Sequence, residues 1–253
     1  MTASKMFGLG GKTALITGAS SGLGTHFARC LGAAGAAVVL AARRTDRLKS
    51  VQAELEGQNI LARSIELDVQ SAESVAKALD AAGPLDIVVN NAGISIVKPA
   101  LDMPEKDWDA VVDTNLRGAW LVAQGAAKRW AAAKQPGSIV NIASILGLRT
   151  IGQVAPYNAS KAGLIHLTRA LAMEWARYRI RVNAICPGYI ETEMNGDFWQ
   201  TPGGQKLIER IPQRRIGKPE ELDGALLLLA SEAGSFMTGS VLTVDGGHTV
   251  NSL

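Results

Sequence analysis

Tyr157 and Lys161 are the first residues whose types and spacing could support chemistry, since they lie four positions apart in a stretch with helical character. In a helix this spacing places both side chains on one face, one turn apart. A free tyrosine has a pKa of about 10, and a neighbouring ammonium group favours the phenolate and lowers that pKa. We therefore expect Lys161 to tune Tyr157 for acid–base work near neutral pH. Solvent-facing pairs with this spacing are common, so the pair needs support from other residues.

Two further polar residues fall where they could serve the same site. Ser144 follows the apolar stretch Ser138–Ile142, at the carboxyl end of a predicted strand. From there its hydroxyl could donate a hydrogen bond to a substrate oxygen as negative charge develops on that oxygen. Asn115 lies inside the predicted helix Glu105–Lys134, which is otherwise rich in Val, Leu, Ala and Trp. Ser144, Tyr157 and Lys161 together form a candidate catalytic group, and Asn115 stands out as a polar residue in an otherwise apolar stretch.

A glycine-rich segment joins the predicted first strand to a helix and reads Thr17-Gly18-Ala19-Ser20-Ser21-Gly22-Leu23-Gly24. Glycines in such a turn let the backbone approach a pyrophosphate, and the helix N-terminus adds N–H groups and a positive dipole end. The spacing G-x-x-x-G-x-G differs from the general G-x-G-x-x-G fingerprint. A tight strand–helix turn without a ligand is the alternative. The earlier run Gly8–Gly11 precedes the strand, so it cannot lie at the strand's carboxyl end.

The end of the second predicted strand bears on the choice of dinucleotide. An acidic residue there would bind the ribose hydroxyls of NAD, but this chain has Ala41-Ala42-Arg43-Arg44. The planar, charged guanidinium of Arg43 suits the 2′-phosphate of NADP, so we expect NADPH to be preferred over NADH. The alternative for Arg43 is an ordinary solvated charge, and that is our expectation for Arg44.

Short, almost entirely apolar strands alternate with helical stretches along most of the chain. Such alternation predicts an α/β fold with a parallel, doubly wound sheet covered by helices on both faces. The segment from Gly188 to Pro219 lacks clear periodicity, and a stretch of that length is typical of a lid or binding loop. Strands are expected at Thr13–Thr17, Ala37–Ala42, Ile60–Leu67, Ile87–Asn90, Ser138–Ile142, Arg181–Ile185 and Ser240–Val244, and helices near 23–34, 45–56, 71–82, 104–133, 157–178 and 219–231.

Length and composition exclude several classes of protein. The 253 residues, with 47% hydrophobic and 19% charged residues, suit one large folded α/β domain over 1–253 rather than a disordered chain or a coiled coil. The net charge of +3 is scattered, which argues against a nucleic-acid partner. Two cysteines are too few for a disulfide scaffold, and we expect both to be buried, inert thiols. No apolar run reaches 18 residues, so we expect a cytoplasmic protein without membrane partners.

Metal and hydrolase chemistry find no support. The three histidines, His26, His166 and His248, show no metal-ligand spacing, so no metal is expected. A G-x-S-x-G elbow, which would indicate a serine hydrolase, is absent from the sequence.

The motifs in this order and at this spacing resemble the classical short-chain dehydrogenase/reductase family over almost the whole chain. The matching segments are Thr17–Gly24 for the cofactor loop, Asp68-Val69 for its adenine side, Asn90-Asn91-Ala92-Gly93 on the central strand, Asn115, Ser144, Tyr157 and Lys161 for catalysis, and Pro187-Gly188 with Thr192 on the nicotinamide side. The resemblance implies a Rossmann-type, seven-stranded parallel sheet in the order 3-2-1-4-5-6-7, in one NAD(P)-binding domain with a substrate-binding loop over about 188–219.

The resemblance also implies roles for these residues. Tyr157 would pass a proton to or from the substrate oxygen while hydride moves to or from the nicotinamide. Ser144 would orient the substrate, Lys161 would tune Tyr157 and bind the nicotinamide ribose, and Asn115 would hold a water in a proton relay. The implied cofactor contacts are Gly18, Ser20, Ser21, Gly22, Leu23, Gly24, Arg43, Asp68, Val69, Asn91, Ala92, Gly93, Tyr157, Lys161, Pro187, Gly188, Ile190 and Thr192.

Substrate and assembly are the remaining implications. The family suggests an NADPH-dependent reductase that interconverts a ketone and a secondary alcohol, of the carbonyl or 3-oxoacyl type. An NAD-dependent sugar, polyol or alcohol dehydrogenase and a non-catalytic dinucleotide-binding regulator are the alternatives. In the family, two long helices form an interface between subunits; the corresponding helices are rich in Ala and Gly here, so the resemblance implies a homotetramer or homodimer. At one position the chain departs from NADP users of the family, because Ser21 stands where some have a basic residue.

Either Phe198 or Trp199 is expected to line the substrate pocket, and the proposed substrate contacts are Ser144, Leu146, Val154, Tyr157, Tyr189 and Trp199.

Overall fold

A computed structural model describes residues 3–192 and 197–250 of the chain. Its centre is a parallel sheet with the strand order β3-β2-β1-β4-β5-β6-β7, which confirms the expected doubly wound architecture. The strands are β1 Thr13–Thr17, β2 Ala37–Ala42, β3 Ala62–Glu66, β4 Ile87–Asn90, β5 Gly137–Ile142, β6 Ile180–Pro187 and β7 Val241–Val244. Three of these match the predicted bounds, and the other four differ by one or two residues at one or both ends.

The strands form here because their side chains are apolar on both faces of the sheet. In β4 and β5 every residue is buried, as a strand between two layers of helices requires. From β1 the chain adds strands toward one edge of the sheet (β2, then β3), and from β4 it adds strands toward the other edge. The order therefore reverses between β1 and β4, which pair as parallel neighbours. In an open α/β sheet, this switch point at the carboxyl ends of the strands is where ligands bind.

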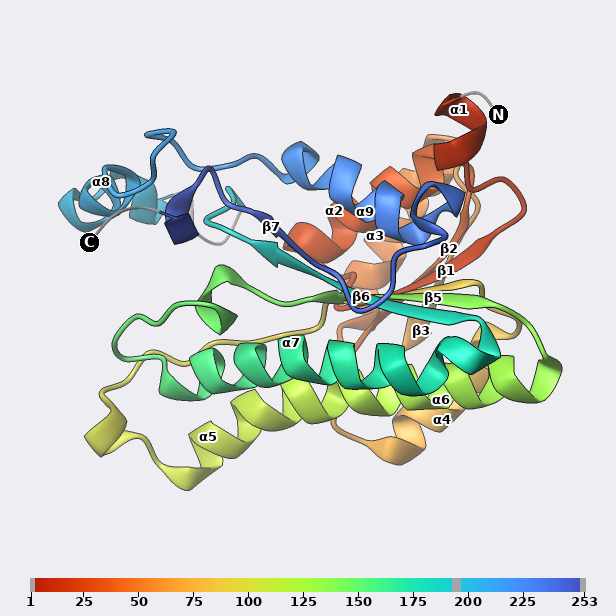
Figure 1. Cartoon of the computed structure of the whole chain (residues 1–253), viewed down its shortest axis with the longest axis horizontal. Helices are drawn as coiled ribbons and strands as arrows, with labels where there is room; N and C mark the ends of the chain where they lie inside the picture. Colours follow the sequence, from red (N-terminus) through yellow and green to blue (C-terminus); the bar gives the residue numbers. More distant parts are fainter. Residues whose placement is uncertain (1–2, 193–196, 251–253) are drawn as a thin grey trace.

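Helices cover both faces of the sheet, as Figure 1 shows. On one face lie α2, α3 and α9, and on the other lie α4, α5, α6 and α7. Their bounds are α1 Ala3–Phe7, α2 Gly22–Ala33, α3 Thr45–Gly57, α4 Ala72–Ala82, α5 Glu105–Val112, α6 Ala119–Ala133, α7 Ala155–Trp175, α8 Pro202–Ile208 and α9 Asp223–Ala230.

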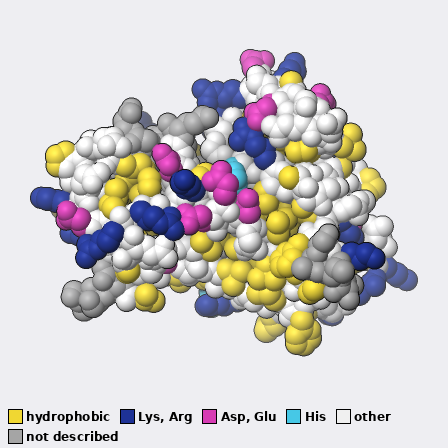
Figure 2. Space-filling model, turned by 90° about the horizontal axis from the view of Figure 1, so that it is seen from above, with side chains coloured by type: hydrophobic (Ala, Val, Ile, Leu, Met, Phe, Trp, Pro, Cys, Tyr) yellow, Lys and Arg dark blue, Asp and Glu magenta, His cyan; other side chains and the backbone are white. Residues whose placement is uncertain are grey.

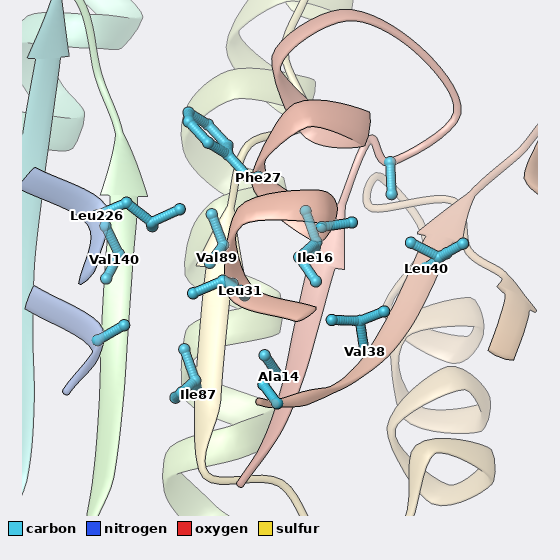
Figure 3. Close-up of a cluster of buried hydrophobic side chains, with 14 of the residues drawn as sticks. Ala14, Ile16, Phe27, Leu31, Val38, Leu40, Ile87, Val89, Val140 and Leu226 are labelled. Carbon is cyan, nitrogen blue, oxygen red and sulfur yellow. The ribbon is translucent and has the colours of Figure 1, made fainter. Parts of the chain in front are cut away.

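Each layer of helices has its own core against the sheet. On one side Phe27 and Leu31 of α2 and Leu226 of α9 pack on Ile16 and Val89, as drawn in Figure 3. A second buried cluster joins α4, α6 and α7 to the opposite face of the sheet. The sheet is therefore held rigidly from both sides, and its carboxyl edge is a firm base for a site.

Two predicted elements differ from the structure. The long helix expected over 104–133 consists of α5 and α6 joined by a π-helical turn, Asp113–Gly118. The stretch from Gly188 to Pro219, in which the sequence shows no clear periodicity, contains the short 3-10 helix Asp197–Gln200 and the helix α8, which begins with Pro202. The start of α8 could be predicted from the local sequence, because Thr201 followed by Pro202 is a typical helix start. In the structure the Thr201 hydroxyl caps the helix by accepting a hydrogen bond from the Gly204 amide at 3.1 Å.

The surface carries charges of both signs. On the face that bears α2, α3 and α9, Lys and Arg side chains lie among Asp and Glu side chains, and Figure 2 shows no broad basic area there. Among the described helices, none combines the length and the apolar character needed to cross a membrane.

Candidate active site

A cleft of about 850 Å³ opens at the carboxyl edge of the sheet. Its walls come from the glycine loop after β1, the end of β2, the segments after β3, β4 and β5, the start of α7, and the loop after β6. A volume of this size falls in the range of ligand sites. Of the residues expected to bind cofactor, the structure brings these to its lining: Gly18, Ser20, Ser21, Gly22, Leu23, Arg43, Asp68, Val69, Asn91, Ala92, Gly93, Tyr157, Lys161, Pro187, Gly188, Ile190 and Thr192.

The glycine loop is held in place by the neighbouring central strand. Thr17 Oγ1 accepts hydrogen bonds from the backbone amides of Asn91 and Ala92, both at 3.0 Å. Asn91 Nδ2 in turn donates to the Thr17 carbonyl at 3.0 Å. Gly18 has a φ of +68°, and a Cβ at this position would lie 2.9 Å from Ala92 Cα. Only glycine suits that position, because the backbone is left-handed and the two segments touch.

Gly24 is the one expected cofactor residue that lies away from the described cleft lining. A Cβ on Gly24 would lie 2.3 Å from the Gly18 carbonyl oxygen. Gly24 therefore lets the first turn of α2 pack directly on the loop. Its effect on a bound dinucleotide passes through the backbone of Gly18.

Both arginines at the end of β2 reach the cleft lining. Arg44 donates to Ser20 Oγ at 2.9 Å and to Ser21 Oγ at 2.7 Å. The expectation that Arg44 is merely a solvated charge is therefore wrong, because its guanidinium ties β2 to the glycine loop. Sequence reasoning missed this contact, since a separation of more than 20 residues leaves no local signal.

The serine and the tyrosine of the candidate catalytic group meet at one wall of the cleft. Ser144 follows β5 and begins the short turn Ile145–Gly147, and its hydroxyl accepts a hydrogen bond from the Leu146 amide at 3.0 Å. A hydrogen bond from Ser144 lowers the pKa of Tyr157, but burial has the larger effect and raises that pKa above its ordinary value. In the protein alone, the lowering of the Tyr157 pKa that the sequence suggested is therefore not present.

Lys161 lies deeper in the same wall. Its Nζ is 5.6 Å from the centre of the Tyr157 ring and donates to the Ile142 carbonyl at 2.8 Å. The side chain is only 4% exposed. Burial lowers the pKa of Lys161 to about 8, because the ammonium form loses its hydration. Lys161 is therefore a cation that is readily deprotonated, beside a tyrosine that keeps its proton.

Asn115 is fully buried in the π-helical turn and lies behind the cleft lining. Its Oδ1 accepts from the Ile94 amide at 2.8 Å, and its Nδ2 donates to the Ile94 carbonyl at 2.9 Å and to Ser160 Oγ at 3.1 Å. Asn115 thus joins the segment after β4 to α7, the helix that carries Tyr157 and Lys161. A π-helical turn is rare but recurs at functional sites, and here it holds Asn115 directly behind the cleft lining.

The nicotinamide-side segment follows directly from β6. The Gly188 amide donates to the Val244 carbonyl at 2.9 Å, which pins this segment to β7. Tyr189 lines the cleft, and its ring packs edge-on against Trp199, with centroids 5.3 Å apart.

Of the expected substrate residues, Ser144, Tyr157 and Tyr189 line the cleft. Leu146, Val154 and Trp199 do not appear among its described lining residues. Trp199 is buried behind Tyr189, and the side chain of Phe198 is outside the described part of the structure.

Metal-ligand clusters and reactive thiols are two further kinds of site that the described residues could contain. In residues 3–192 and 197–250, no group of three His, Cys, Asp or Glu side chains is arranged to hold a metal. Burial raises the pKa of both Cys30 and Cys186, to about 11 for Cys186, so neither thiol is a ready nucleophile.

Comparison with known proteins places the chain in a family. The family model described as enoyl-(acyl carrier protein) reductase matches residues 18–249, which span the cleft and nearly the whole sheet. The chain belongs to the short-chain dehydrogenase/reductase family. Members of this family named among its relatives are dehydrogenases and reductases, so the protein is an oxidoreductase that interconverts an alcohol and a carbonyl with a dinucleotide cofactor.

Individual relatives within the short-chain dehydrogenase/reductase family have different substrates. The chain is 38% identical to a gluconate 5-dehydrogenase from Gluconobacter oxydans, over 97% of this chain and 98% of that one. It is 39% identical to a 3-oxoacyl-[acyl-carrier-protein] reductase from Aquifex aeolicus, over 94% and 98% of the two chains. A crystal structure of a gluconate 5-dehydrogenase from Burkholderia cenocepacia in complex with NADP and tartrate is 36% identical, with a TM-score of 0.94 over 99% and 100% of the two chains.

Proposed function

We propose that this protein is an NADPH-preferring reductase that converts a ketone to a secondary alcohol, and that Tyr157 is its acid–base residue. The observation that carries the proposal is the convergence of Ser144, Tyr157 and Lys161 on one wall of a cleft that also contains the glycine loop. The whole chain would act as one dinucleotide-binding domain, with residues of about 188–219 forming the substrate-binding loop.

The cleft suits a dinucleotide in shape and in charge. A Cβ added to Gly93 would lie 3.3 Å from Asn115 Oδ1 and 3.5 Å from Lys161 Nζ. The missing side chain of Gly93 therefore leaves room for a polar group between Asn115 and Lys161. At the other end, the N-terminus of α2 faces the glycine loop and provides amide donors for phosphate oxygens. In this proposal Lys161 binds the nicotinamide ribose, Asp68 and Val69 lie on the adenine side, and Gly24 acts through the loop backbone.

Each catalytic residue acts at a definite atom. A bound nicotinamide supplies the hydride. The Tyr157 hydroxyl donates its proton to the substrate oxygen, so the carbonyl gains one hydride and one proton and becomes an alcohol. Ser144 Oγ donates a hydrogen bond to the same oxygen and stabilises its developing charge. Positive charge on Lys161 favours the phenolate that remains. Asn115 positions the water of a proton relay in the space beside Gly93.

The preference for NADPH rests on the two arginines at the end of β2. The guanidinium of Arg43 would bind the 2′-phosphate. Arg44 supports this site because it donates hydrogen bonds to the hydroxyls of Ser20 and Ser21 in the glycine loop. The relative from Burkholderia cenocepacia binds NADP, whereas a glycerol dehydrogenase from Listeria innocua, 37% identical, is NAD-dependent. An NAD-dependent sugar or polyol dehydrogenase is therefore the second candidate.

The catalytic assignment is tested with Tyr157→Phe, which removes the proton donor and keeps the ring. We expect kcat for ketone reduction to fall by about 10³-fold or more, with NADPH affinity within about twofold of the unaltered protein. The measurement is steady-state kinetics over a panel of ketones, together with fluorescence titration of NADPH. Full activity in this variant would refute the assignment, and cofactor binding without turnover of any carbonyl or alcohol would favour a regulatory protein.

Cofactor choice is tested with Arg43→Asp and Arg44→Ser, each compared with the unaltered protein. We expect the ratio of kcat/KM for NADPH over NADH to fall by about 10- to 100-fold in Arg43→Asp, because a carboxylate repels the 2′-phosphate and suits ribose hydroxyls. Arg44→Ser should raise KM for both cofactors, since it frees the glycine loop. An unchanged ratio in Arg43→Asp would remove Arg43 from the explanation.

A further inference from the structure

The π-helical turn Asp113–Gly118 contacts three separate parts of the cleft wall. Some of its residues contact the segment after β3, which carries Asp68 and Val69. Others contact the segment after β4 and the helix α7, which carries Tyr157 and Lys161. A single turn therefore connects the wall at the end of β3 to the wall that holds the proposed acid–base residue.

Gln70 makes the contact between the turn and the segment after β3. Its Nε2 donates to Thr114 Oγ1 at 2.7 Å, and Thr114 Oγ1 donates in turn to the Ala110 carbonyl at 2.7 Å. The Gln70 carbonyl accepts from Arg117 Nη1 at 2.8 Å. The Gln70 amide donates to Asp68 Oδ1 at 3.0 Å, so Gln70 also orients a carboxylate that lines the cleft.

Close packing holds the same two segments together. A Cβ added to Gly118 would lie 2.8 Å from Val69 Cγ2 and 3.0 Å from the Val69 carbonyl oxygen, so the end of the turn lies directly against the segment after β3. Thr114, Gly118 and Val69 are all buried. Gln70 lies outside the described lining of the cleft, so its effect on the cleft passes through the residues that it holds.

From the turn, the hydrogen bonds continue to α7. Asn115 follows Thr114 directly in the chain, and its Nδ2 donates to Ser160 Oγ at 3.1 Å. Ser160 Oγ donates to the Tyr157 carbonyl at 2.9 Å. Asn115 and Ser160 are buried, so water does not compete for these bonds. Hydrogen bonds and one peptide bond thus lead from Gln70 to the backbone of Tyr157.

We infer that Gln70 is a positioning residue, which couples binding of the adenosine end of the cofactor to the placement of Asn115 and Tyr157 through the π-helical turn. This inference rests on the proposed function, since it takes Asp68 and Val69 as the adenine side of the cleft. An adenosine group bound there restrains the segment after β3, Gln70 restrains the turn, and the turn restrains α7. Coupling between two sites typically changes an equilibrium constant by about 5- to 150-fold.

Hydrogen–deuterium exchange measures this coupling without turnover. The ligands are 2′,5′-ADP and 5′-AMP, the adenosine portions of NADP and NAD, neither of which carries a nicotinamide. In the unaltered protein, we expect a saturating ligand to slow amide exchange in the peptide over residues 155–163 by about fivefold or more. In Gln70→Met, which keeps the length of the side chain and removes its amide, the slowing should fall below about twofold. Because the ligand is saturating, weaker binding does not account for such a loss.

Kinetics with NADPH separate positioning from binding. We expect kcat for ketone reduction to fall by about tenfold in Gln70→Met, with KM for NADPH within about threefold, because the placement of Tyr157 changes while the adenosine contacts remain. Thr114→Val removes the acceptor of the same hydrogen bond, so the double variant should be no slower than the slower single variant. Gln58→Met, at an exposed position directly after α3, is the control and should match the unaltered protein in both experiments.

Three outcomes would overturn the inference. The first is that neither adenosine ligand slows exchange over residues 155–163 in the unaltered protein, and the second is equal slowing in Gln70→Met. The third is a loss confined to KM for NADPH and to ligand affinity, which would make Gln70 a support of the adenosine site alone. Ketone reduction is a separate readout: its absence rejects the proposed reductase activity even where the exchange coupling is present, and its presence keeps that activity where the coupling is absent.

Discussion

At the scale of single residues, the burial of Lys161 in the candidate site opposes the stability of the fold. The side chain is almost fully buried, and its contacts with the described residues include one carbonyl acceptor and no carboxylate. Removing an ammonium group from water without a counter-charge disfavours its charged form, which is why its pKa falls to about 8. The protein tolerates this cost where the charge lies beside Tyr157.

The lowered pKa of Lys161 predicts a stability that rises with pH. In the unfolded chain the lysine keeps its ordinary pKa of 10.5, so between about pH 8 and 10.5 the unfolded state binds more protons than the folded state. The free energy of unfolding should therefore increase through this window, by about 2 kcal/mol from pH 7 to pH 9.5.

The measurement is urea denaturation at both pH values, for the unaltered protein and for Lys161→Met. Other groups titrate in both proteins, so the difference between the two isolates Lys161. The unaltered protein should gain the additional 2 kcal/mol or so, and the variant should not. An identical pH dependence in the two proteins would mean that Lys161 keeps its ordinary pKa.

At the scale of elements, α7 carries Tyr157 and Lys161 and must keep its register against the sheet. Inside the molecule, Asn141 of β5 donates to Thr168 Oγ1 of α7 at 2.9 Å, and Asn90 of β4 donates to Asn141 Oδ1 at 2.9 Å. All three residues are buried. This line of hydrogen bonds joins two central strands to α7, seven residues beyond Lys161.

A substitution that removes one of these hydrogen-bonding side chains should lower the free energy of unfolding more than a typical substitution on the surface does. Thr168→Val keeps the shape of the side chain but leaves Asn141 Nδ2 without its acceptor in a dry environment. We expect a loss of about 1–3 kcal/mol in the free energy of unfolding, measured by chemical denaturation. Thr249→Val, at a half-exposed position outside this line, is the control and should change stability by less than about 0.5 kcal/mol. A Thr168→Val protein as stable as the control would show that a water or a shift of Asn141 replaces the bond.

The junction of α5 and α6 is the element in which local sequence reasoning was least complete. Apolar periodicity indicated one long helix, and the backbone does continue through the junction. The π-helical turn inside it follows from tertiary contacts, because Asn115 is held by both the Ile94 backbone and Ser160. The apolar periodicity of a helix reports nothing about contacts with distant segments, so it could not predict this turn.

At the scale of the whole molecule, the exposed apolar side chains bear on assembly. Trp108 of α5 is 41% exposed, Met173 of α7 is 80% exposed, and Phe236, before β7, is fully exposed. Large apolar groups in contact with water are typical of surfaces that another chain covers. We therefore propose a homotetramer or homodimer, in which α5, α6 and α7 meet their copies.

Light scattering coupled to size-exclusion chromatography tests this assembly. We expect a mass of two or four chains, and a shift to a smaller species in Met173→Glu, since a carboxylate at a covered apolar position is costly to bury. Leu61→Glu, at a 75% exposed position just before the edge strand β3, is the control and should leave the mass unchanged. A monomeric unaltered protein would contradict the proposal.

The sequence by itself determined most of the sheet, and it predicted that Ser144, Tyr157 and Lys161 lie at the same edge of that sheet. The buried strands could be predicted because an apolar run between turn residues is a local pattern, and β1, β2 and β4 have their predicted bounds. Ser144, Tyr157 and Lys161 could be predicted together because the carboxyl ends of parallel strands must meet at one edge.

Only the tertiary structure decided how these residues are surrounded. Arg44 binds Ser20 and Ser21, Lys161 lies in a dry wall with a lowered pKa, and Tyr189 packs between Trp199 and the C-terminal His248. Each of these facts depends on distances between segments that are remote in the chain. Periodicity and motif spacing describe neighbours along the backbone, whereas burial, charge and hydrogen-bond partners are set by neighbours in space.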